Sequence, residues 1–444
     1  MDIRFSFSRF LLFALGLWVL GACTPVTPTF PVVTQEPGAP LIVESPYPPP
    51  VTNTPGPYPP PGYVAATATP SRPPLCQFPG GPTPEVSGSG LDGYVLSEPT
   101  VVLTSTTGIG IAAWLPDNER LLLTNYLPDS GNQYIETFNT LTGEIQIYGE
   151  RNGGETPVWL SVAEGVAYTT VIFDESLPRG GRQELRVSYG NPLIFEIIAE
   201  DVFNASLATD GIRLFYFDRA IGDQPQAWNF SAQAPETISF DLTNSAYQKI
   251  STKPLTPGAT FQIASQPGGT WMAFYGPSLM YLANTQTSQL CEIDLGDRLA
   301  YDVQWSPDGR YLAFLSAAYN LSSLHHTSSE AVILDIITGE QLHSDLEVSY
   351  IYEMDWGADS RTLAVLAHIE IVDSRPYKGL FLLDAVGGNS RRVLPDQIFG
   401  GGSLDELAWS SDGQLIAIKC PIWSESEPMI IEDQICFIAV QNIP

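Results

Sequence analysis

The sequence predicts an all-β fold: a seven-bladed β-propeller of four-stranded antiparallel blades, behind an exported leader and a proline-rich stalk. Three observations carry this prediction: a short apolar run that ends at a cysteine, a proline-dense stretch, and one hairpin pattern that recurs along the rest of the chain. They divide the chain into a signal peptide at residues 1–22, a disordered stalk at 23–88 and the propeller at 89–444.

The first residues have the order of a secretory signal. Arg4 and Arg9 give a charged start, and the apolar run Phe10–Leu20 follows. A helix of that length spans roughly 16 Å, which is too short for a bilayer core of about 30 Å. The segment therefore predicts export rather than a transmembrane helix.

The apolar run closes with Leu20-Gly21-Ala22-Cys23, which resembles the lipobox of bacterial lipoproteins. The resemblance implies cleavage before Cys23, a diacylglyceryl group on its sulfur, and acyl chains such as palmitate that hold the protein on a membrane. We therefore expect a lipid-anchored, extracytoplasmic protein on the periplasmic or cell-surface face of a cell membrane. An ordinary signal peptide with a chance cysteine is the alternative.

Proline dominates the segment from Thr24 to Pro84, which holds more than half of the chain's 38 prolines. Proline fixes φ and lacks a backbone donor, so neither helix nor sheet is expected there. The predicted state is a disordered, polyproline-II-like spacer. Docking of this segment into an aromatic-lined groove of a partner is the alternative interpretation.

Beyond the stalk, one hairpin recurs. The clearest copy runs from Trp305 through the turn residues Asp308 and Gly309 to the alternating strand Leu312-Ala313-Phe314. The same offsets recur at intervals of roughly 40 to 58 residues, a period typical of repeat architectures. The copies begin at Trp114, Trp159, Leu207, Ser265, Trp305, Trp356 and Trp409.

The physical content of each copy favours a propeller blade. Asp-Gly supplies the positive-φ positions of a tight hairpin. The strand after the turn is apolar on both faces, so both faces must be covered by neighbouring sheets. Further strand-like runs follow most copies, for instance Ala331–Asp335 and Gly379–Asp384. A β-sandwich is the alternative fold, but it would not repeat one hairpin at this interval.

The last copy lacks one strand. After Leu415–Cys420 only one further strand-like run, Gln434–Val440, precedes the final residue, Pro444. A spare strand, Thr100–Thr104, lies before the first copy. We predict that this N-terminal strand completes the last blade and closes the ring, which leaves no long free edge.

The repeats resemble the TolB-like, WD-type β-propeller repeats of bacterial exported proteins, whose hallmark is W-S-P-D-G-x-x-L-A-F. The resemblance covers roughly residues 107–440 and is strongest from Trp305 to Phe314. It implies the propeller fold, and it leaves function open because propellers host many functions. In TolB an α/β domain precedes the propeller, and here the proline-rich segment stands in its place.

Composition restricts the partners. The chain carries 49 acidic and 20 basic residues, a formal net charge of −29. Such a surface repels nucleic-acid phosphates, so we expect no nucleic-acid partner. We expect instead a monomer that meets an envelope protein, peptide or glycan.

Motifs for catalysis and metal binding are lacking in the sequence. It has no G-x-S-x-G elbow, no phosphate-binding glycine loop and no C-x-x-C pair. The adjacent His325 and His326 lie in a polar stretch, where neighbouring side chains diverge and make poor metal ligands. We therefore predict no catalytic residues, no metal and no cofactor.

One group of acids could form a ligand site. Asp302, Glu353 and Glu406 each lie three residues before a repeat tryptophan, on the strand expected to line the central channel. They could together bind a cation or a basic ligand at one end of the channel. Alternatively, each carboxylate accepts hydrogen bonds from nearby backbone or channel water.

Two function classes follow. The first is a non-catalytic protein- or ligand-binding module of the cell envelope. The second is a propeller enzyme or glycan-binding protein with a site at the channel mouth. The absence of a recognisable nucleophile–base pair favours the first.

The cysteines predict two disulfides. With Cys23 acylated, four cysteines remain, and an exported compartment favours pairing. Cys420 and Cys436 lie in strands expected to be antiparallel neighbours, within disulfide reach. That leaves Cys76 and Cys291, a pair that would join the end of the stalk to a middle blade.

Overall fold

A computed structural model describes most of the chain from residue 75 onward. Residues 1–74, with the signal peptide, Cys23 and most of the proline-rich segment, lie outside the described residues, as do His325 and His326. None of the described helical residues form a segment long and apolar enough to cross a membrane. The described ranges are 75–82, 90–127, 130–154, 156–174, 180–202, 207–217, 225–237, 262–276, 279–287, 289–296, 298–318, 329–348, 350–372, 375–395, 397, 399, 406–424 and 430–442.

Six blades are complete four-stranded antiparallel sheets whose strands follow one another along the chain. The first three are β3 (Ile109–Trp114), β4 (Arg120–Tyr126), β5 (Gln133–Asn139) and β6 (Ile145–Arg151); β7 (Val158–Leu160), β8 (Gly165–Phe173), β9 (Gly181–Tyr189) and β10 (Ile194–Ala199); β11 (Ala208–Thr209), β12 (Arg213–Phe217), β13 (Pro225–Asn229) and β14 (Ala234–Thr237). The next three are β15 (Gln262–Ser265), β16 (Trp271–Gly276), β17 (Leu279–Asn284) and β18 (Leu290–Ile293); β19 (Arg298–Trp305), β20 (Tyr311–Ala318), β21 (Ser329–Asp335) and β22 (Gln341–His343); β23 (Ile351–Trp356), β24 (Thr362–Val372), β25 (Arg375–Asp384) and β26 (Ser390–Val393).

The seventh blade combines the two ends of the described chain. Its strands β27 (Leu407–Trp409), β28 (Leu415–Lys419) and the long β30 (Ile430–Asn442) come from the C-terminal end, with the short β29 (Ile422–Trp423) paired to β30. The outer edge of β30 pairs with β2 (Thr100–Ser105) and with β1 (Tyr94–Leu96), which follows the single turn of 3-10 helix η1 (Gly90–Gly93). The predicted closure of the last blade by an N-terminal strand is confirmed, and β1 extends it.

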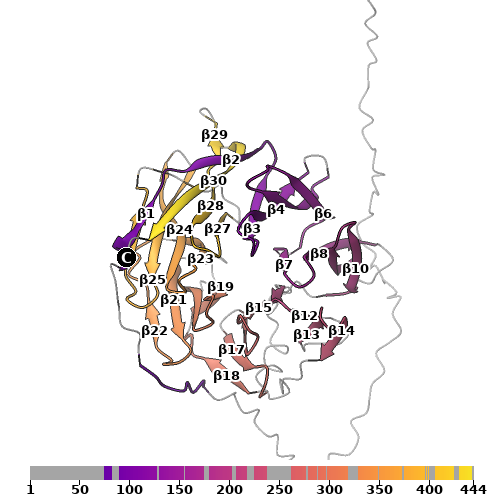
Figure 1. Cartoon of the computed structure of the whole chain (residues 1–444). Helices are drawn as coiled ribbons and strands as arrows, with labels where there is room; N and C mark the ends of the chain where they lie inside the picture. Colours follow the sequence, from indigo (N-terminus) through magenta and orange to yellow (C-terminus); the bar gives the residue numbers. More distant parts are fainter. Residues whose placement is uncertain are drawn as a thin grey trace, which may run out of the picture. The chain divides into compact units, whose positions relative to one another are not determined.

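The seven innermost strands form a closed ring. Each contacts the innermost strand of the next blade, and β27 of blade seven contacts β3 of blade one. Figure 1 shows these strands turned toward a common centre, with β2 and β30 side by side where the ring closes. The predicted all-β, seven-bladed propeller is therefore confirmed.

The core lies between the blades. Seven apolar clusters occur among the described residues, and each is formed by two neighbouring blades. In blade five Leu312 and Phe314 pack toward blade four, whereas Ala313 and Leu315 pack toward blade six. The two apolar faces read from the sequence are thus both buried, one against each neighbour.

The repeat tryptophan bonds one blade to the next. The indole Nε1 of Trp305 donates to the carbonyl oxygen of Ala264 on blade four at 3.1 Å, and that of Trp114 donates to Ala408 on blade seven at 3.0 Å. A buried indole needs such an acceptor, and the innermost strand of the preceding blade supplies it. This contact explains the tryptophan at positions 114 and 305, whereas Trp409 Nε1 donates within its own hairpin to the carbonyl oxygen of Gly413 at 3.2 Å.

The Asp-Gly turn closes the first hairpin of the blade. Asp308 Oδ1 accepts from the backbone N–H of Arg310 at 3.0 Å, and Gly309 has φ +72°. A Cβ at Gly309 would lie 3.0 Å from the side chain of Gln266 on the preceding blade. Glycine therefore serves both the left-handed turn and the close approach of the two blades.

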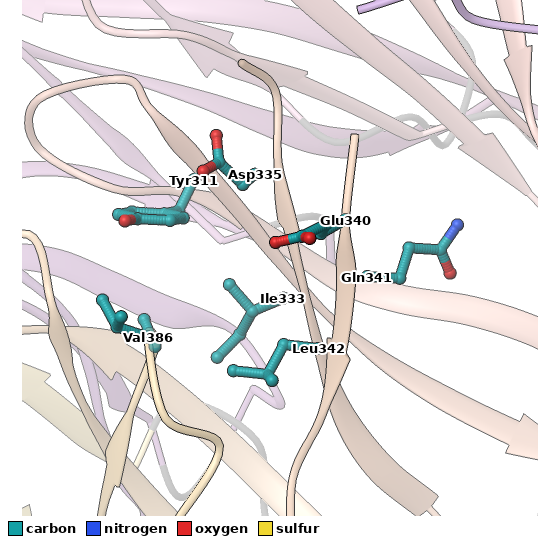
Figure 2. Close-up of a pocket in the computed structure, with 8 residues that line it drawn as sticks. Tyr311, Ile333, Asp335, Glu340, Gln341, Leu342 and Val386 are labelled. Atoms are coloured by element: carbon teal, nitrogen blue, oxygen red, sulfur yellow. The ribbon is translucent and has the colours of Figure 1, made fainter. Parts of the chain in front are cut away.

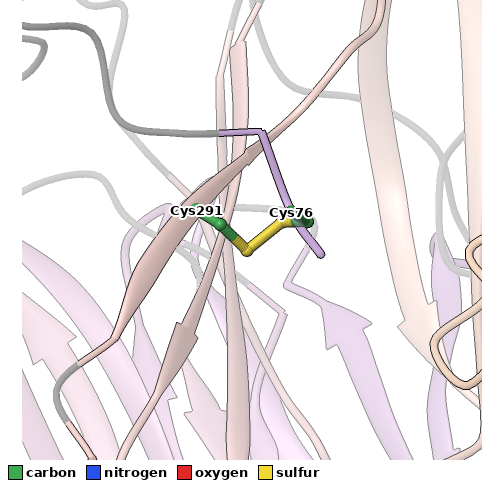
Figure 3. Close-up of a disulfide and its surroundings, with 2 residues drawn as sticks. All are labelled: Cys76 and Cys291. Carbon is green, nitrogen blue, oxygen red and sulfur yellow. A yellow bond between two sulfur atoms is a disulfide. The ribbon is translucent and has the colours of Figure 1, made fainter. Parts of the chain in front are cut away.

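Two disulfides hold the described cysteines. Cys420 and Cys436 are joined within blade seven with a Cα–Cα distance of 5.9 Å. Cys436 lies opposite Ile418, so Cys420, which follows the end of β28, bridges to it diagonally. Cys76 is joined to Cys291 in β18, the outer strand of blade four (Figure 3).

The segment at 75–82 lies along the propeller rather than apart from it. Leu75 forms a parallel bridge with Glu292, and the partly buried Phe78 packs on the core between blades four and five. Gly80 N–H donates to the carbonyl oxygen of Ile337 in blade five at 2.8 Å. Composition assigned these residues to the stalk, but their contacts place them on the folded domain, because the disulfide fixes them to blade four.

Candidate functional site

The three acids selected from the sequence lie on or beside the innermost strands of blades five, six and seven. Asp302 is on β19, Glu353 is on β23, and Glu406 directly precedes β27. The pairing register of β19 and of β23 shifts close to these positions, and Asp302 has φ +48°. Such bulges re-aim side chains away from the regular alternation of a strand.

Glu353 and Glu406 are brought into contact. Glu353 Oε2 accepts from the backbone N–H of Glu406 at 2.6 Å. Asp355 lies two residues after Glu353 on β23, and its Oδ2 accepts from the backbone N–H of Trp409 at 2.5 Å. Acids of blade six therefore bind the backbone of the innermost strand of blade seven at two points.

Glu406 forms an ion pair with Lys378 of β25. The Lys378 Nζ donates to Glu406 Oε2, and both side chains are buried. The same Nζ lies 3.8 Å from the centroid of the Tyr352 ring, a cation–π contact. Burial lowers the pKa of Lys378, and the negative charge of Glu406 opposes that shift. The Glu406 charge is thus compensated inside the protein.

A second buried pair continues the network to the closure of the ring. Lys419 Nζ, at the end of β28, lies 3.1 Å from Asp433 Oδ2 on β30. The same carboxylate oxygen accepts from the backbone N–H of Ile109 on blade one at 3.1 Å. Buried charges with these partners join blades seven and one beside the point where the chain passes from β2 to β3.

Asp302 is hydrogen-bonded to a glutamine of its own strand. Gln304 Nε2 donates to Asp302 Oδ1 at 3.0 Å and to the carbonyl oxygen of Met354 at 2.7 Å, which links blades five and six. Burial raises the pKa of Asp355 to about 7. The two backbone hydrogen bonds that Asp355 accepts lower this pKa, and the charge of Asp302 raises it further. The structure thus places Asp302 close to Asp355 and joins Glu353 to Glu406.

The contacts of these acids correspond to the second interpretation given above, in which carboxylates accept hydrogen bonds from the protein. Among the described residues, no group of three or more His, Cys, Asp or Glu side chains is arranged to hold a metal ion. The cation site suggested for Asp302, Glu353 and Glu406 stays a prediction. The visible role of this network is to bind adjacent blades together.

Sequence reasoning missed Lys378, Lys419 and Asp433. The chain has few lysines, and Lys378 and Lys419 each adjoin a run of apolar residues in a strand. A lysine on a core-facing strand of an acidic protein is a signal for a buried ion pair, because an isolated buried charge is too costly. The acid that it meets is fixed only by the packing of two blades.

A pocket of about 310 Å³ lies between blades five and six. Ile333 and Leu342 are opposite one another on β21 and β22, and Val386 of blade six faces them across the pocket (Figure 2). Figure 2 shows the carboxylate of Glu340 over these apolar side chains, on the side of the Tyr311 ring, while Gln341 points away. The pocket combines an apolar floor, an aromatic side and carboxylates.

The second acid of the pocket, Asp335, is largely buried. Asp335 Oδ2 pairs with Arg310 Nη2 at 2.7 Å, and the Arg310 guanidinium lies 5.4 Å from the centroid of the Tyr311 ring. Asp335 Oδ1 accepts from the backbone N–H of Ile337 at 2.8 Å. Glu340 is exposed at the edge of the pocket, so it is the carboxylate that a solvent-borne ligand meets first.

Comparison with known proteins supports the fold. No family model matches the sequence, and no curated protein matches it. An oligogalacturonate lyase in complex with manganese is similar in structure, with 11% identity and a TM-score of 0.50 over 79% of this chain and 98% of that chain. TolB from Acinetobacter baumannii is similar at 13% identity and a TM-score of 0.41, over 62% of this chain.

This chain has a seven-bladed β-propeller fold. The ring described above and the coverage of the lyase agree on that architecture. The match spans 63% of the TolB chain, less than two thirds of its length. At these identities the likeness concerns architecture, and the chemistry of this chain must be argued from its own residues.

Proposed function

We propose that this chain is a lipid-anchored, extracytoplasmic β-propeller that serves the cell envelope as a monomeric, non-catalytic binding module. We propose further that the pocket between blades five and six receives a basic side chain of a protein or peptide partner. The observation that carries the proposal is the lining of that pocket, an apolar floor with the exposed Glu340 at its edge. An aliphatic stem that ends in a positive charge is complementary to this lining.

The charge of the whole chain supports a cationic partner. A formal net charge of −29 creates a long-range field that attracts basic surfaces and speeds their encounter. Tyr311 adds an aromatic group at the pocket, and aromatic rings favour cations near their faces. Anionic partners would meet repulsion from the protein as a whole.

Binding of small probes tests the pocket. Calorimetric or NMR titration of the full chain, with Cys23→Ser to avoid acylation, would use butylguanidinium, butylammonium and butyrate. We expect millimolar binding of the two cations and weaker binding of butyrate, since each probe has few heavy atoms. Glu340→Gln should weaken cation binding by roughly tenfold, the value of one charge-assisted hydrogen bond.

The chain offers a matched control in blade one. Glu144 follows the Thr-Gly of the equivalent β5–β6 turn, as Glu340 does at the β21–β22 turn, and it does not line the pocket. Glu144→Gln should leave the titration unchanged. Equal effects of the two substitutions, or equal binding of butyrate and the cations, would refute this ligand assignment.

The proposed compartment is supported by the disulfides. Two disulfides in one chain are typical of oxidising compartments. The membrane anchor rests on Cys23 and the apolar run before it. Detergent phase partitioning of the intact protein and of Cys23→Ser tests it: the intact chain should enter the detergent phase and the variant the aqueous phase. Identical partitioning of the two would exclude the anchor.

A further inference from the structure

We propose that the Cys76–Cys291 disulfide is a mechanical coupling, which directs a pull on the stalk into blade four and keeps it away from the strands that close the ring. The source of the load is the membrane anchor proposed above, and the inference rests on that proposal for its biological setting. The coupling itself is a property of the described residues and can be measured without a membrane.

The course of the chain after Cys76 determines which contacts a pull on the stalk would reach if the disulfide were absent. Phe78 packs on the core between blades four and five, and Arg310 Nη2 of blade five donates to the carbonyl oxygen of Pro82 at 3.3 Å. Leu91 and Tyr94 then pack in the core between blades six and seven. The N-terminal segment therefore contacts four successive blades before β2 completes the seventh.

Before β2, the described residues of this segment are held by core packing, side-chain hydrogen bonds and one short strand. Tyr94 Oη donates to Asp359 Oδ2 at 2.6 Å, and Arg391 Nη2 donates to the Tyr94 carbonyl oxygen at 2.8 Å. The strand β1 adds only three paired residues, which face Val440, Gln441 and Asn442 on β30. Contacts of this kind open locally at low free energy compared with a packed blade.

A pulling force transmitted along the chain would break these contacts one after another, in the order of the sequence. Without the disulfide it would remove Phe78, then Leu91, and would reach β1 at its first residue, Tyr94. The next element is β2, whose pairing with β30 closes the last blade. Loss of β2 would leave the long β30 as an open edge, so the ring would open at its closure.

The disulfide changes the point at which the load enters. Cys291 lies in β18, where it pairs with Leu282 of β17 inside a complete four-stranded blade. Its side chain is buried in the core between blades four and five. A pull on Cys76 therefore acts on a packed blade through a covalent bond. The segment from residue 77 to β2 then lies within the covalent loop between Cys76 and Cys291 and carries no tension.

Single-molecule pulling tests the coupling. One handle would replace residues 1–23 and the other would follow Pro444, so that the chain is otherwise complete. In the disulfide-bonded protein the chain between Cys76 and Cys291, a sequence separation of 215 residues, cannot be extended by the pull. At about 3.6 Å per residue, full unfolding should therefore extend it roughly 770 Å less than the reduced chain.

The decisive signal comes before global unfolding. Cys76→Ala/Cys291→Ala should show an early event at low force, in which the segment between residues 76 and 105 leaves the propeller and adds about 100 Å. The wild-type protein should lack this event. Cys420→Ala/Cys436→Ala is the matched control: its loop spans only 16 residues and should leave the early part of the trace unchanged.

Reduction of folded, tethered Cys420→Ala/Cys436→Ala, in which Cys76–Cys291 is the disulfide left to reduce, gives the same comparison without a refolding step, in case the Cys76→Ala/Cys291→Ala variant does not fold. A first event of equal force and step size with and without the disulfide would overturn the proposal. So would peeling of the 76–105 segment in the oxidised protein. Neither result depends on Cys23, so a failed partitioning experiment and a failed pulling experiment are distinct outcomes.

Discussion

Lys378 and Glu406 form an ion pair in which the lysine side chain is 0% exposed and the glutamate side chain 1% exposed. The pair joins the third strand of blade six to the start of the innermost strand of blade seven. Glu353 and Tyr352 of blade six contact the same two residues. One buried charge pair thus fixes the seam between two blades on the side where the innermost strands begin.

Removing one partner of this pair should be strongly destabilising. Lys378→Met leaves the Glu406 carboxylate buried without its cation, and Glu406→Gln leaves the ammonium without its anion. Each should lower the free energy of unfolding by about 3–5 kcal/mol, the usual effect of an uncompensated buried charge. The double variant Lys378→Met/Glu406→Gln should lose much less than the sum, as measured by denaturant titration.

The exposed pair between Asp117 and Arg120 is the control for that cycle. Its two side chains are 32% and 31% exposed at an N···O distance of 2.5 Å. Asp117→Asn, which keeps an acceptor for the backbone N–H groups of Glu119 and Arg120, should change the free energy of unfolding by less than about 1 kcal/mol. Equal losses of unfolding free energy at the exposed and the buried pair would show that burial does not determine how much the ion pair between blades six and seven contributes to stability.

Asp355 should make the protein more stable in mild acid. Its pKa is raised to about 7, chiefly by burial, so the folded state holds a proton that the unfolded state releases near pH 4. The contribution of Asp355 to the free energy of unfolding is full below about pH 4 and is lost as the pH rises through about 7. The effect amounts to up to a few kcal/mol. Urea titrations from pH 4 to 8 should show this trend in wild type and lose it in Asp355→Asn.

Asp384 should change the stability with pH in the opposite direction and serves as the comparison. Burial alone would raise its pKa, but the hydrogen bond and charge of Arg361 leave that pKa below its ordinary value. Its contribution is present above pH 4 and is lost as the pH falls further. If Asp355→Asn and Asp384→Asn altered the pH profile in the same direction, the assignment of Asp355 as a buried protonated acid would be wrong.

The Cys420–Cys436 disulfide should stabilise the last blade. It closes a loop with a sequence separation of 16 residues, for which chain entropy gives about 3 kcal/mol. Cys420→Ala/Cys436→Ala should therefore lower the melting temperature, which calorimetry measures. Non-reducing peptide mapping should recover Cys420 with Cys436 and Cys76 with Cys291, and any exchanged pairing would contradict the strand order of blade seven.

Closure of the ring should depend on the N-terminal strands. A fragment that begins at Ala68 retains the disulfide, β1 and β2, and should keep the thermal stability of the whole chain. A fragment that begins at Thr107 lacks both strands, and β30 becomes a long open edge. We expect it to aggregate in size-exclusion chromatography, because unpaired edges associate. Equal melting temperatures of the two fragments would show that closure lies elsewhere.

The sequence alone determined the architecture of this protein. The hairpin is encoded locally: Asp-Gly sets the turn, alternation sets the two buried faces, and the tryptophan marks the end of the innermost strand. Because seven copies each need cover on both faces, only a closed ring of blades satisfies all of them. The strand at Thr100–Thr104 could also be assigned by counting, since the last copy lacked one strand.

Only the tertiary structure decided which distant groups meet. Three such contacts depend on how one blade packs on the next: the pair of Lys378 with Glu406, the hydrogen bond that the Ile109 N–H donates to Asp433, and the course of residues 75–82 over blades four and five. The repeat period specifies the faces of a blade, whereas a charge contact depends on the rotation and bulges of two neighbouring sheets. Those are set by the whole ring, so no local pattern in the chain encodes them.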